Sequence, residues 1–294
     1  MLCSLFSAAL VSAALLQQLD STFPVERGQR LAVHSFLGDI AVTAWDRDQV
    51  RVEGEPTGRT RIEIGRTGAT VDVRTQGRRG PAGRVDLKIS VPAWMPLDLS
   101  GVNTDVRVAG ARGPVTVETV QGEIAVEGGD GLVSLQSVEG EVSLRGARGR
   151  IVVHSVNQDV AIASSSGDIT AETVNGGIRL EGVEATALAA STVNGDVYYD
   201  GPVRNGGRYA LSSHNGDLTL TVAEGTNAAV TVSTYNGEFE SDFPVTLTEA
   251  RRGRRFAFTL GSGSAQVNLD SFQGSIRLVR PGSRSGRVGH DHDE

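Results

Sequence analysis

Thr119-Val-Gln-Gly122-Glu123-Ile124 is one copy of a six-residue phrase that recurs along this chain. The phrase consists of a hydroxyl residue, two variable positions, a glycine, an acidic residue and an aliphatic residue. Further copies begin at Ser137, Ser155, Ser164, Thr173, Thr192, Ser213 and Thr234, and outlying copies begin at Ser35 and Ser271. Repetition at a fixed spacing is typical of a stacked architecture in which each repeat packs on the next.

The glycine of the phrase, or the residue that replaces it, predicts a corner. Successive corners from Thr104 to Gly237 are 18, 18, 18, 18, 19, 21 and 21 residues apart. A second, glycine-rich corner falls about halfway between them, at residues 110–113, 128–131 and 146–149. Each coil therefore holds two short strands and two turns. Because glycine adopts positive φ at no steric cost, its restriction to the corners predicts positive φ there.

The residues between the corners alternate between apolar and polar. Val115 and Val117 share parity with Thr119, and Ile124 and Val126 point the same way after the corner. This period of two is typical of half-buried strands, whereas a helix would need apolar residues three and four positions apart. Nine-residue units could also form an antiparallel meander, but identical corners at a fixed period favour parallel stacking.

The predicted fold class is therefore all-β, a parallel β-solenoid with about 18 residues per coil. We expect a right-handed coil from the general preference of parallel crossovers. From Thr104 to Gly274 there is room for roughly nine coils, which gives a rod on the order of 40 Å long at one strand spacing per coil.

Four segments follow from the pattern. Residues 1–20 form a signal or leader segment, because the apolar run 5–16 is shorter than the roughly 20 residues of a membrane span and contains small residues suited to cleavage. No Lys or Arg precedes this run. Residues 21–100 form an irregular N-terminal β-region that caps the coils, 101–280 are the solenoid repeats, and 281–294 are a polar, disordered tail.

Composition excludes several classes of function. A formal net charge of −7 argues against affinity for nucleic acid or anionic membranes. Cys3 is the only cysteine, so one chain can form neither a disulfide nor a cysteine-based metal site. We expect no cofactor and no integral membrane span in the mature chain.

The acidic positions of the phrase form a column if the coils stack in register. Two like charges about 4 Å apart repel by about 1 kcal/mol in water, so the carboxylates must fan outward, accept backbone N–H bonds or bind a cation such as Ca²⁺. We interpret them as turn caps. Weak candidates for metal ligands are Asp105, Glu123, Glu141 and Asp159.

The hydroxyl positions point inward by parity, and no base follows them at a constant offset. We therefore interpret them as partners of corner backbone groups and not as nucleophiles. The asparagines that precede the corners fit turn chemistry. The histidines lack a recurrent acidic or serine partner, so no catalytic residue is predicted.

The chain resembles the bacterial "putative adhesin" β-solenoid family over about residues 22–280. The resemblance lies in Phe23-Pro-Val25, Gly38-Asp39-Ile40-Ala-Val42 with Trp45-Asp46, Val91-Pro92 and the chain of Gly-Asp/Glu-Ile/Val corners. It implies an exported or envelope-associated β-solenoid, and it brings no catalytic residues with it. Thr104 and Gln158 depart from the pattern at the glycine position, as do Gly177 and Ser275 at the acidic one.

The leading hypothesis is a non-enzymatic, exported protein of the periplasm, cell surface or surroundings that serves as an adhesin-like binding or structural scaffold. Its expected partner is an unidentified envelope protein or polysaccharide. One alternative is a carbohydrate-active β-helix enzyme, although such enzymes need paired carboxylates in a groove, and aromatics are only 5% here. The other alternative is a solenoid that assembles end to end into filaments.

Overall fold

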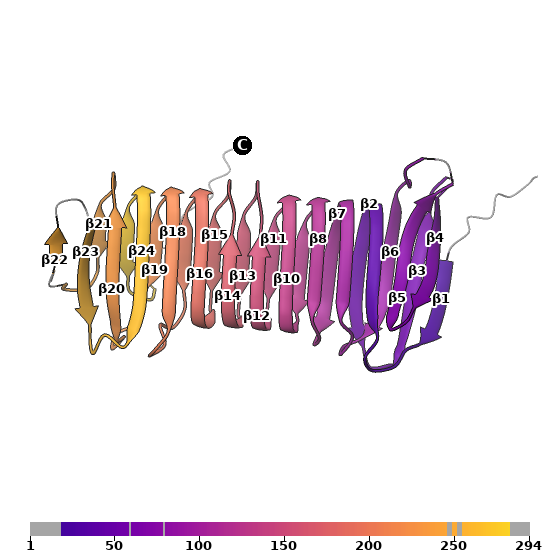
Figure 1. Cartoon of the computed structure of the whole chain (residues 1–294), viewed down its shortest axis with the longest axis horizontal. Coiled ribbons are helices and arrows are strands. Elements are labelled where there is room, and N and C mark those ends of the chain that lie inside the picture. Colours follow the sequence, from indigo (N-terminus) through magenta and orange to yellow (C-terminus); the bar gives the residue numbers. More distant parts are fainter. Residues whose placement is uncertain (1–18, 59, 79, 246–248, 252–254, 283–294) are drawn as a thin grey trace, which may run out of the picture.

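The computed structural model describes residues 19–58, 60–78, 80–245, 249–251 and 255–282. The described chain forms a rod in which two faces of β-strands enclose a core and are joined by corners (Figure 1). No residue in these ranges is helical, and none of them belongs to a helix that could cross a membrane.

The strands of the first face follow one another from the N-terminal end of the rod. Their order is β4 (Thr60–Thr67), β5 (Thr70–Gly77), the first half of β2 (Arg30–Trp45), the first half of β7 (Leu97–Ala111), β8 (Val115–Gln121), β10 (Asp130–Glu139), β12 (Arg148–His154), β14 (Ser166–Glu172), β16 (Glu184–Asn194), β18 (Arg208–Asn215), β24 (Ala265–Gln273), β20 (Ala228–Thr234), β23 (Arg255–Leu260) and β22 (Glu249–Arg251).

The second face runs alongside in the same direction. Its order is β1 (Leu19–Pro24), β3 (Gln49–Pro56), β6 (Val85–Pro92), the second half of β2, the second half of β7, β9 (Ile124–Gly128), β11 (Val142–Arg145), β13 (Val160–Ala163), β15 (Ile178–Glu181), β17 (Val197–Asp200), β19 (Leu218–Thr221), β25 (Ile276–Val279) and β21 (Phe239–Ser241).

Pairing is parallel along both faces and becomes antiparallel at their ends. Among the described strands, the antiparallel pairs are β4–β5, β20–β23 and β22–β23 on the first face and β1–β3 and β3–β6 on the second. Residues 18 positions apart stack directly, as Val115, Val133 and Ile151 do. The predicted all-β parallel solenoid is therefore confirmed, while the hand of the coil stays a prediction.

The predicted facing of the strands is also confirmed. Val117 of β8 and Ile124 of β9 are fully buried and belong to one continuous cluster between the two faces. Each such side chain contributes about 1.5–3 kcal/mol when it is fully removed from water. The apolar residues that alternate along the strands therefore form the core that stabilises the rod.

We call each full coil a rung, the corner formed by the recurrent phrase the first corner, and the glycine-rich corner the second corner. Ten rungs of the described chain, from β2 to β20 and β21, carry a first corner of the recurrent type, and the last two do not follow the order of the sequence. The rung of β24 and β25 lies between the rung of β18 and β19 and the rung of β20 and β21. In Figure 1 the yellow β24 accordingly lies between β18 and the orange β20.

This arrangement corrects the expectation that Gly237 stacks on Gly216. Gly274 stacks on Gly216, and Gly237 stacks on Gly274. The chain leaves β21, pairs back through β22 and β23 along the outer edge of β20, and then fills the gap with β24 and β25. The phrase at Ser271 is a regular rung and not an outlier.

The N-terminal end has a similar inserted rung. The strand β2, which holds the phrase at Ser35, spans both faces and pairs with β7 on one side and with β5 and β6 on the other. The stretch predicted as an irregular cap therefore contains one complete rung. The domain boundaries themselves stay predictions, and the leader at 1–18 and the tail from 283 lie outside the described residues.

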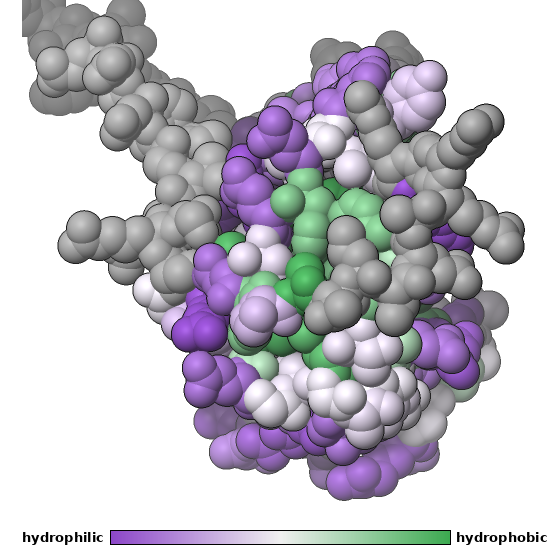
Figure 2. Space-filling view, turned by 90° about the vertical axis from the view of Figure 1, so that its left-hand side faces the viewer, coloured by the Kyte–Doolittle hydropathy of each residue, from purple (hydrophilic) through white to green (hydrophobic). Residues whose placement is uncertain are grey.

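Figure 2 looks at the C-terminal end of the rod and shows hydrophobic side chains at its centre with hydrophilic ones around them. Phe239, Phe256 and Leu260 are half-buried and pack against the core there. The rings of Phe239 and Phe256 meet edge to face at 4.8 Å. These aromatic side chains extend the core beyond the last aliphatic rung.

Some first-corner glycines have the predicted positive φ, whereas others are required for a different reason. Gly140, Gly176 and Gly216 do not have positive φ. A Cβ on each would instead overlap the corner carbonyl of the preceding rung. Positive φ occurs at the first-corner glycines Gly38, Gly122 and Gly195 and at second-corner glycines such as Gly128 and Gly146. At Gly140, Gly176 and Gly216, glycine is therefore required because one backbone lies close to the next, and not because φ is positive.

Candidate binding edge

The first corners of successive rungs lie over one another and form one long edge of the rod. At this edge each rung places a hydroxyl residue, an apolar residue, an amide, a glycine and an acidic residue in turn. Each type of residue therefore forms a column along the edge.

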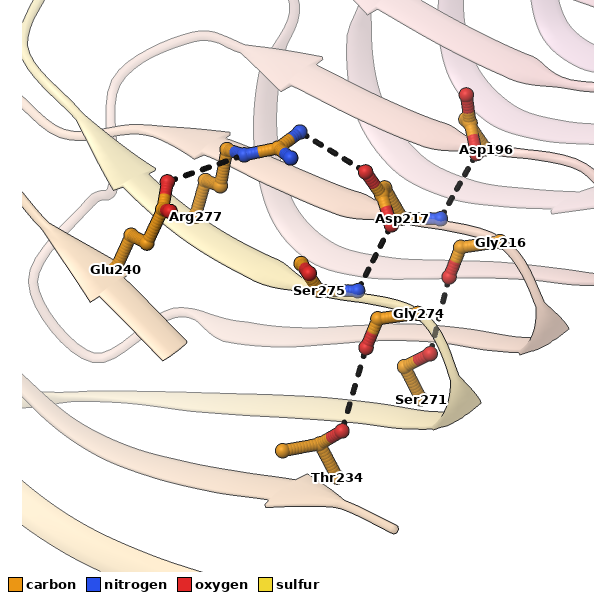
Figure 3. Close-up of polar contacts among 9 residues, drawn as sticks. All are labelled: Asp196, Gly216, Asp217, Thr234, Glu240, Ser271, Gly274, Ser275 and Arg277. Carbon is orange, nitrogen blue, oxygen red and sulfur yellow. Dashed lines mark hydrogen bonds and ion pairs between the residues drawn. The ribbon is translucent and has the colours of Figure 1, made fainter. Parts of the chain in front are cut away.

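The hydroxyl column is internal, as predicted. Its members at the first corner are at most 6% exposed, and seven of them donate to the corner carbonyl of the neighbouring rung. Thr192 donates to Gly176 at 2.9 Å, and Ser271 donates to Gly216 at 2.9 Å (Figure 3). Thr234 then donates to Gly274 at 3.2 Å. These hydroxyl groups are buried and hydrogen-bonded inside the corner, so they are not accessible nucleophiles.

The rung of Ser155 breaks this column. Ser155 is buried, but its hydroxyl has no hydrogen-bond partner among the described residues. Its own corner carries Gln158 in place of glycine. At the neighbouring corners a Cβ in this position would meet the backbone of the preceding corner. The departure from glycine at Gln158 therefore coincides with the missing hydrogen bond of Ser155.

The acidic column caps the corners at four of its aspartates. The N–H of Glu123 donates to Asp105 at 2.9 Å, and the N–H of Gly177 donates to Asp159 at 2.7 Å. The same bond links Asp217 to Asp196 and Ser275 to Asp217, each at 2.8 Å (Figure 3). The longer glutamates make no such bond: Glu123 pairs with Arg107 at 3.6 Å.

The four weak metal candidates, Asp105, Glu123, Glu141 and Asp159, lie in consecutive rungs of this column. Two of them cap the backbone, and one makes an ion pair. Within the described ranges no group of three or more His, Cys, Asp or Glu residues could hold a metal ion. Their interpretation as metal ligands stays a prediction.

The amide column forms a ladder on the outside of the edge. Asn175 donates to Asn157 at 3.0 Å, Asn194 to Asn175 at 2.8 Å, and Asn215 to Asn194 at 2.7 Å. The N–H of Asn175 also donates to the Val156 carbonyl at 2.7 Å. Besides their predicted place in the turns, these asparagines therefore form side-chain hydrogen bonds from one rung to the next.

An exposed apolar column runs beside the amides. It occupies the first of the two variable positions of the phrase. Eight of the nine large hydrophobic side chains that are exposed in the described chain occupy this single position of the rung. They are Phe36, Val102, Val120, Val156, Val174, Val193, Phe272 and Tyr235. We call this column, completed by the half-exposed Val138 and by His214, the apolar stripe.

The stripe ends in a stack of three rings. His214 and Phe272 stack at 4.7 Å, and Phe272 and Tyr235 at 5.0 Å, with both ring pairs within 3° of parallel. This stack exists only because the β24 rung is inserted between β18 and β20. The valine that repeats at the second position of the phrase was the signal in the sequence that could have revealed the rest of the stripe.

One constellation with the residue types of a hydrolase lies elsewhere, on the first face. Nδ1 of His34 lies 2.6 Å from Oγ of Ser100, and Nε2 of His34 lies 3.9 Å from Oδ1 of Asp72. The last distance is too long for a hydrogen bond. Arg74 instead donates to both oxygens of Asp72, at 2.9 and 2.6 Å. The arrangement therefore lacks the oriented base of a catalytic triad.

The remaining histidines and the adjacent Tyr198 and Tyr199 lie apart from this constellation. His154 contacts Glu172 at 3.2 Å on the exposed first face. Of the adjacent tyrosines, Tyr199 is buried, while Tyr198 lies beneath Arg179 on the outer surface. His290 and His292 lie outside the described residues.

A family profile described as Toastrack DUF4097 matches residues 29–279. No match is found among curated proteins.

Solved structures give weak similarities that extend over most of both chains. A "putative adhesin" from Bacteroides fragilis is 11% identical with a TM-score of 0.36, covering 90% of this chain and 97% of that one. A "putative adhesin" from Parabacteroides merdae is 11% identical with a TM-score of 0.32, covering 89% and 96%. A "putative cell adhesion protein" from Clostridium sporogenes is 9% identical with a TM-score of 0.24, covering 90% and 100%.

Proposed function

This chain belongs to the Toastrack DUF4097 family, and from that premise we propose that it is a non-enzymatic, adhesin-like binding scaffold of the bacterial cell envelope. Export is part of the proposal, and it is supported by the apolar run at residues 5–16. The adhesin names of the similar solved proteins agree with it.

The apolar stripe is the observation that carries the proposal. Contiguous exposed apolar surface larger than a few hundred Å² is unusual on a soluble protein and marks interaction sites. Ten stacked positions at one strand spacing give a stripe about 43 Å long. Because the residues project from a corner, the stripe is convex and fits a partner protein that offers an apolar groove.

The charges beside the stripe restrict that partner further. Asp105, Glu141 and Asp196 lie three positions beyond the stripe in their rungs, and none makes an ion pair with a described residue. A groove with Lys or Arg along its rim would therefore complement this edge.

A non-enzymatic role is supported by the internal position of the hydroxyl groups. Thr119, Ser137 and Ser213 donate to backbone carbonyls inside the corner. Ser100 faces solvent beside His34, but the acid that would orient the histidine is bound to Arg74.

Photo-crosslinking in intact native cells tests the proposal. A crosslinking amino acid at Val156, in the stripe, should capture one envelope protein, and the additional changes Val120→Thr and Val174→Thr should abolish the adduct. The same amino acid at Val152, which points outward from β12 on the first face, is the matched control. Equal adducts from both positions, no adduct from Val156, or recovery of the chain in the cytoplasmic fraction would contradict the proposal.

A further inference from the structure

A hollow crosses the second face at the N-terminal part of the rod and continues onto the second corner. Its first part, ≈ 500 Å³, lies over β2, β7, β9, β11 and β13. Its second part, ≈ 690 Å³, is lined by residues 110–112, 127–130, 146 and 148. Both parts are lined by Glu127, and they adjoin where Arg145 precedes Gly146. The two parts therefore form one continuous surface depression.

Small side chains create this hollow. Its floor is formed by two adjacent columns of outward positions in five rungs, where the small side chains are Ala41, Ala109, Ala125, Ser143, Ala161 and Ala163 and the larger ones are Thr43, Arg107, Glu127 and Arg145. Further along the column of Ala125 and Ala161, Arg179 and Tyr198 fill the corresponding space. At the second corner, no atom lies within 4 Å of the place where Gly146 would carry a Cβ. The floor thus offers flat aliphatic C–H surface.

Arginines without an ion pair border the hollow. Arg112, Arg145 and Arg148 line it, and none of them pairs with a carboxylate in the described part of the chain. A fourth lining arginine, Arg107, is paired with Glu123 at 3.6 Å. The planar guanidinium presents a fork of donors that matches a carboxylate or phosphate. This concentration of unpaired cations contrasts with the net charge of −7 of the whole chain.

Two carboxylates lie among these arginines. Glu127 stacks directly on Arg145 in register, and Asp130 stacks on Arg148. Neither carboxylate makes an ion pair with a described residue. A ligand that fills the hollow must therefore supply both anionic groups for the arginines and hydrogen-bond donors for the carboxylates.

We propose that the hollow binds a linear acidic polysaccharide. The carboxylates of its sugar residues bond Arg112, Arg145 and Arg148, its hydroxyls donate to Glu127 and Asp130, and the C–H faces of its rings lie on the alanine floor. A polyphosphate chain supplies the anions but no hydroxyl donors, so Glu127 and Asp130 would repel it. This site is on the corner opposite the apolar stripe, and the proposal does not depend on the proposed function of that stripe.

Calorimetric titration of the full chain with size-fractionated oligogalacturonate tests this site. The double variant R145Q/R148Q should bind at least about a hundredfold more weakly, since each of the two lost charge-assisted hydrogen bonds is worth at least about tenfold. The variant R150Q/R208Q is the matched control, because it removes the same charge from the first face and should bind within about twofold of wild type. Wild type should bind neutral dextran and polyphosphate more weakly than oligogalacturonate.

The variant E127A separates specific recognition from simple charge attraction. Loss of a hydroxyl acceptor should weaken the binding of oligogalacturonate, whereas loss of a negative charge should strengthen the binding of polyphosphate. The proposal is overturned if wild type does not bind oligogalacturonate, if R145Q/R148Q and R150Q/R208Q weaken binding equally, if polyphosphate binds as tightly, or if E127A tightens oligogalacturonate binding. Each outcome is independent of whether the stripe binds a protein.

Discussion

Gly101 and Thr104 exchange the places that a hydroxyl residue and a glycine hold in the neighbouring rungs. Gly101 stacks between Ser35 and Thr119, and Thr104 stacks on Gly38. A Cβ on Gly101 would lie 2.5 Å from the Cβ of Thr104. The buried side chain of Thr104 therefore fills the space that a hydroxyl residue fills elsewhere, and the core stays packed although both positions depart from the phrase.

This relationship predicts a non-additive pair of substitutions. Gly101→Ser alone should reduce the free energy of unfolding by about 2–3 kcal/mol, because two side chains would compete for one space. Adding Thr104→Gly should restore most of that loss, since the pair then matches its neighbours. A double-mutant cycle by urea unfolding measures the coupling. Additive losses would show that the two residues do not share the space.

The close approach of corner backbones predicts a large effect of one methyl group. Gly140→Ala should lower the free energy of unfolding by about 2–3 kcal/mol, because its Cβ would overlap the carbonyl of Gly122. Gly65 in β4 is the matched control, since it has ordinary φ and open space where a Cβ would lie. Gly65→Ala should be neutral or stabilise by up to about 1 kcal/mol. Comparable losses in both variants would mean that lost chain flexibility, and not the corner contact, is decisive.

The two sides of a strand should differ sharply in their tolerance of charge. Leu135 is fully buried, whereas Gln136 points to solvent. Leu135→Asp should cost more than about 4 kcal/mol and abolish cooperative thermal unfolding, because it buries a carboxylate without a partner. Gln136→Asp should change stability by about 0.5 kcal/mol or less. Calorimetry checks both, and equal damage would overturn the facing of the strands.

Two buried tyrosines predict a loss of stability at high pH. Burial raises the pKa of the Tyr199 phenol, and burial likewise raises the pKa of Tyr209. Their hydroxyls donate to the carbonyls of Pro202 and Ala185. Since the raised pKa belongs to the folded state, the stabilisation is complete below the unfolded pKa of about 10 and is lost as pH rises above it.

Urea unfolding between pH 9 and pH 11 measures this effect. The stability advantage of wild type over the variant Y199F/Y209F should shrink steadily across that range. Tyr198→Phe, on the outer side of the same strand, should leave the pH dependence of wild type unchanged. A constant difference between wild type and Y199F/Y209F would show that the tyrosines do not contribute to the loss.

Several elements could be predicted because each depends on the local pattern. The alternation around Val115 and Ile124 determined the strand facing, and the parity of Thr119 placed its hydroxyl inside the corner. The period of 18 predicts which residues stack on one another wherever neighbouring rungs are also consecutive in the sequence. Those predictions needed only the geometry of a strand and of a repeated corner.

The remaining features depend on contacts between distant segments. Nothing in the spacing of Gly237 and Gly274 shows that the later residue stacks first, because the order is decided by the return through β22 and β23. The triad-like contact of His34 with Ser100 needs the inserted β2 rung for the same reason. The stripe does not follow from parity, because Val120 and its equivalents occupy outward positions, which in the strands between the corners are polar.

Disulfide trapping tests the central claim, which is that the rungs stack in register with β24 inserted. In a Cys3→Ser background, cysteine is introduced at His214 together with either Phe272 or Tyr235. Residues 214 and 272 lie in adjacent rungs, about 4.8 Å apart, whereas 214 and 235 are two rungs, or about 9.6 Å, apart and beyond the reach of a disulfide. The account predicts that the 214–272 pair oxidises readily and that the 214–235 pair does not. A disulfide in the 214–235 pair, with none in the 214–272 pair, would show that the rungs follow the order of the sequence.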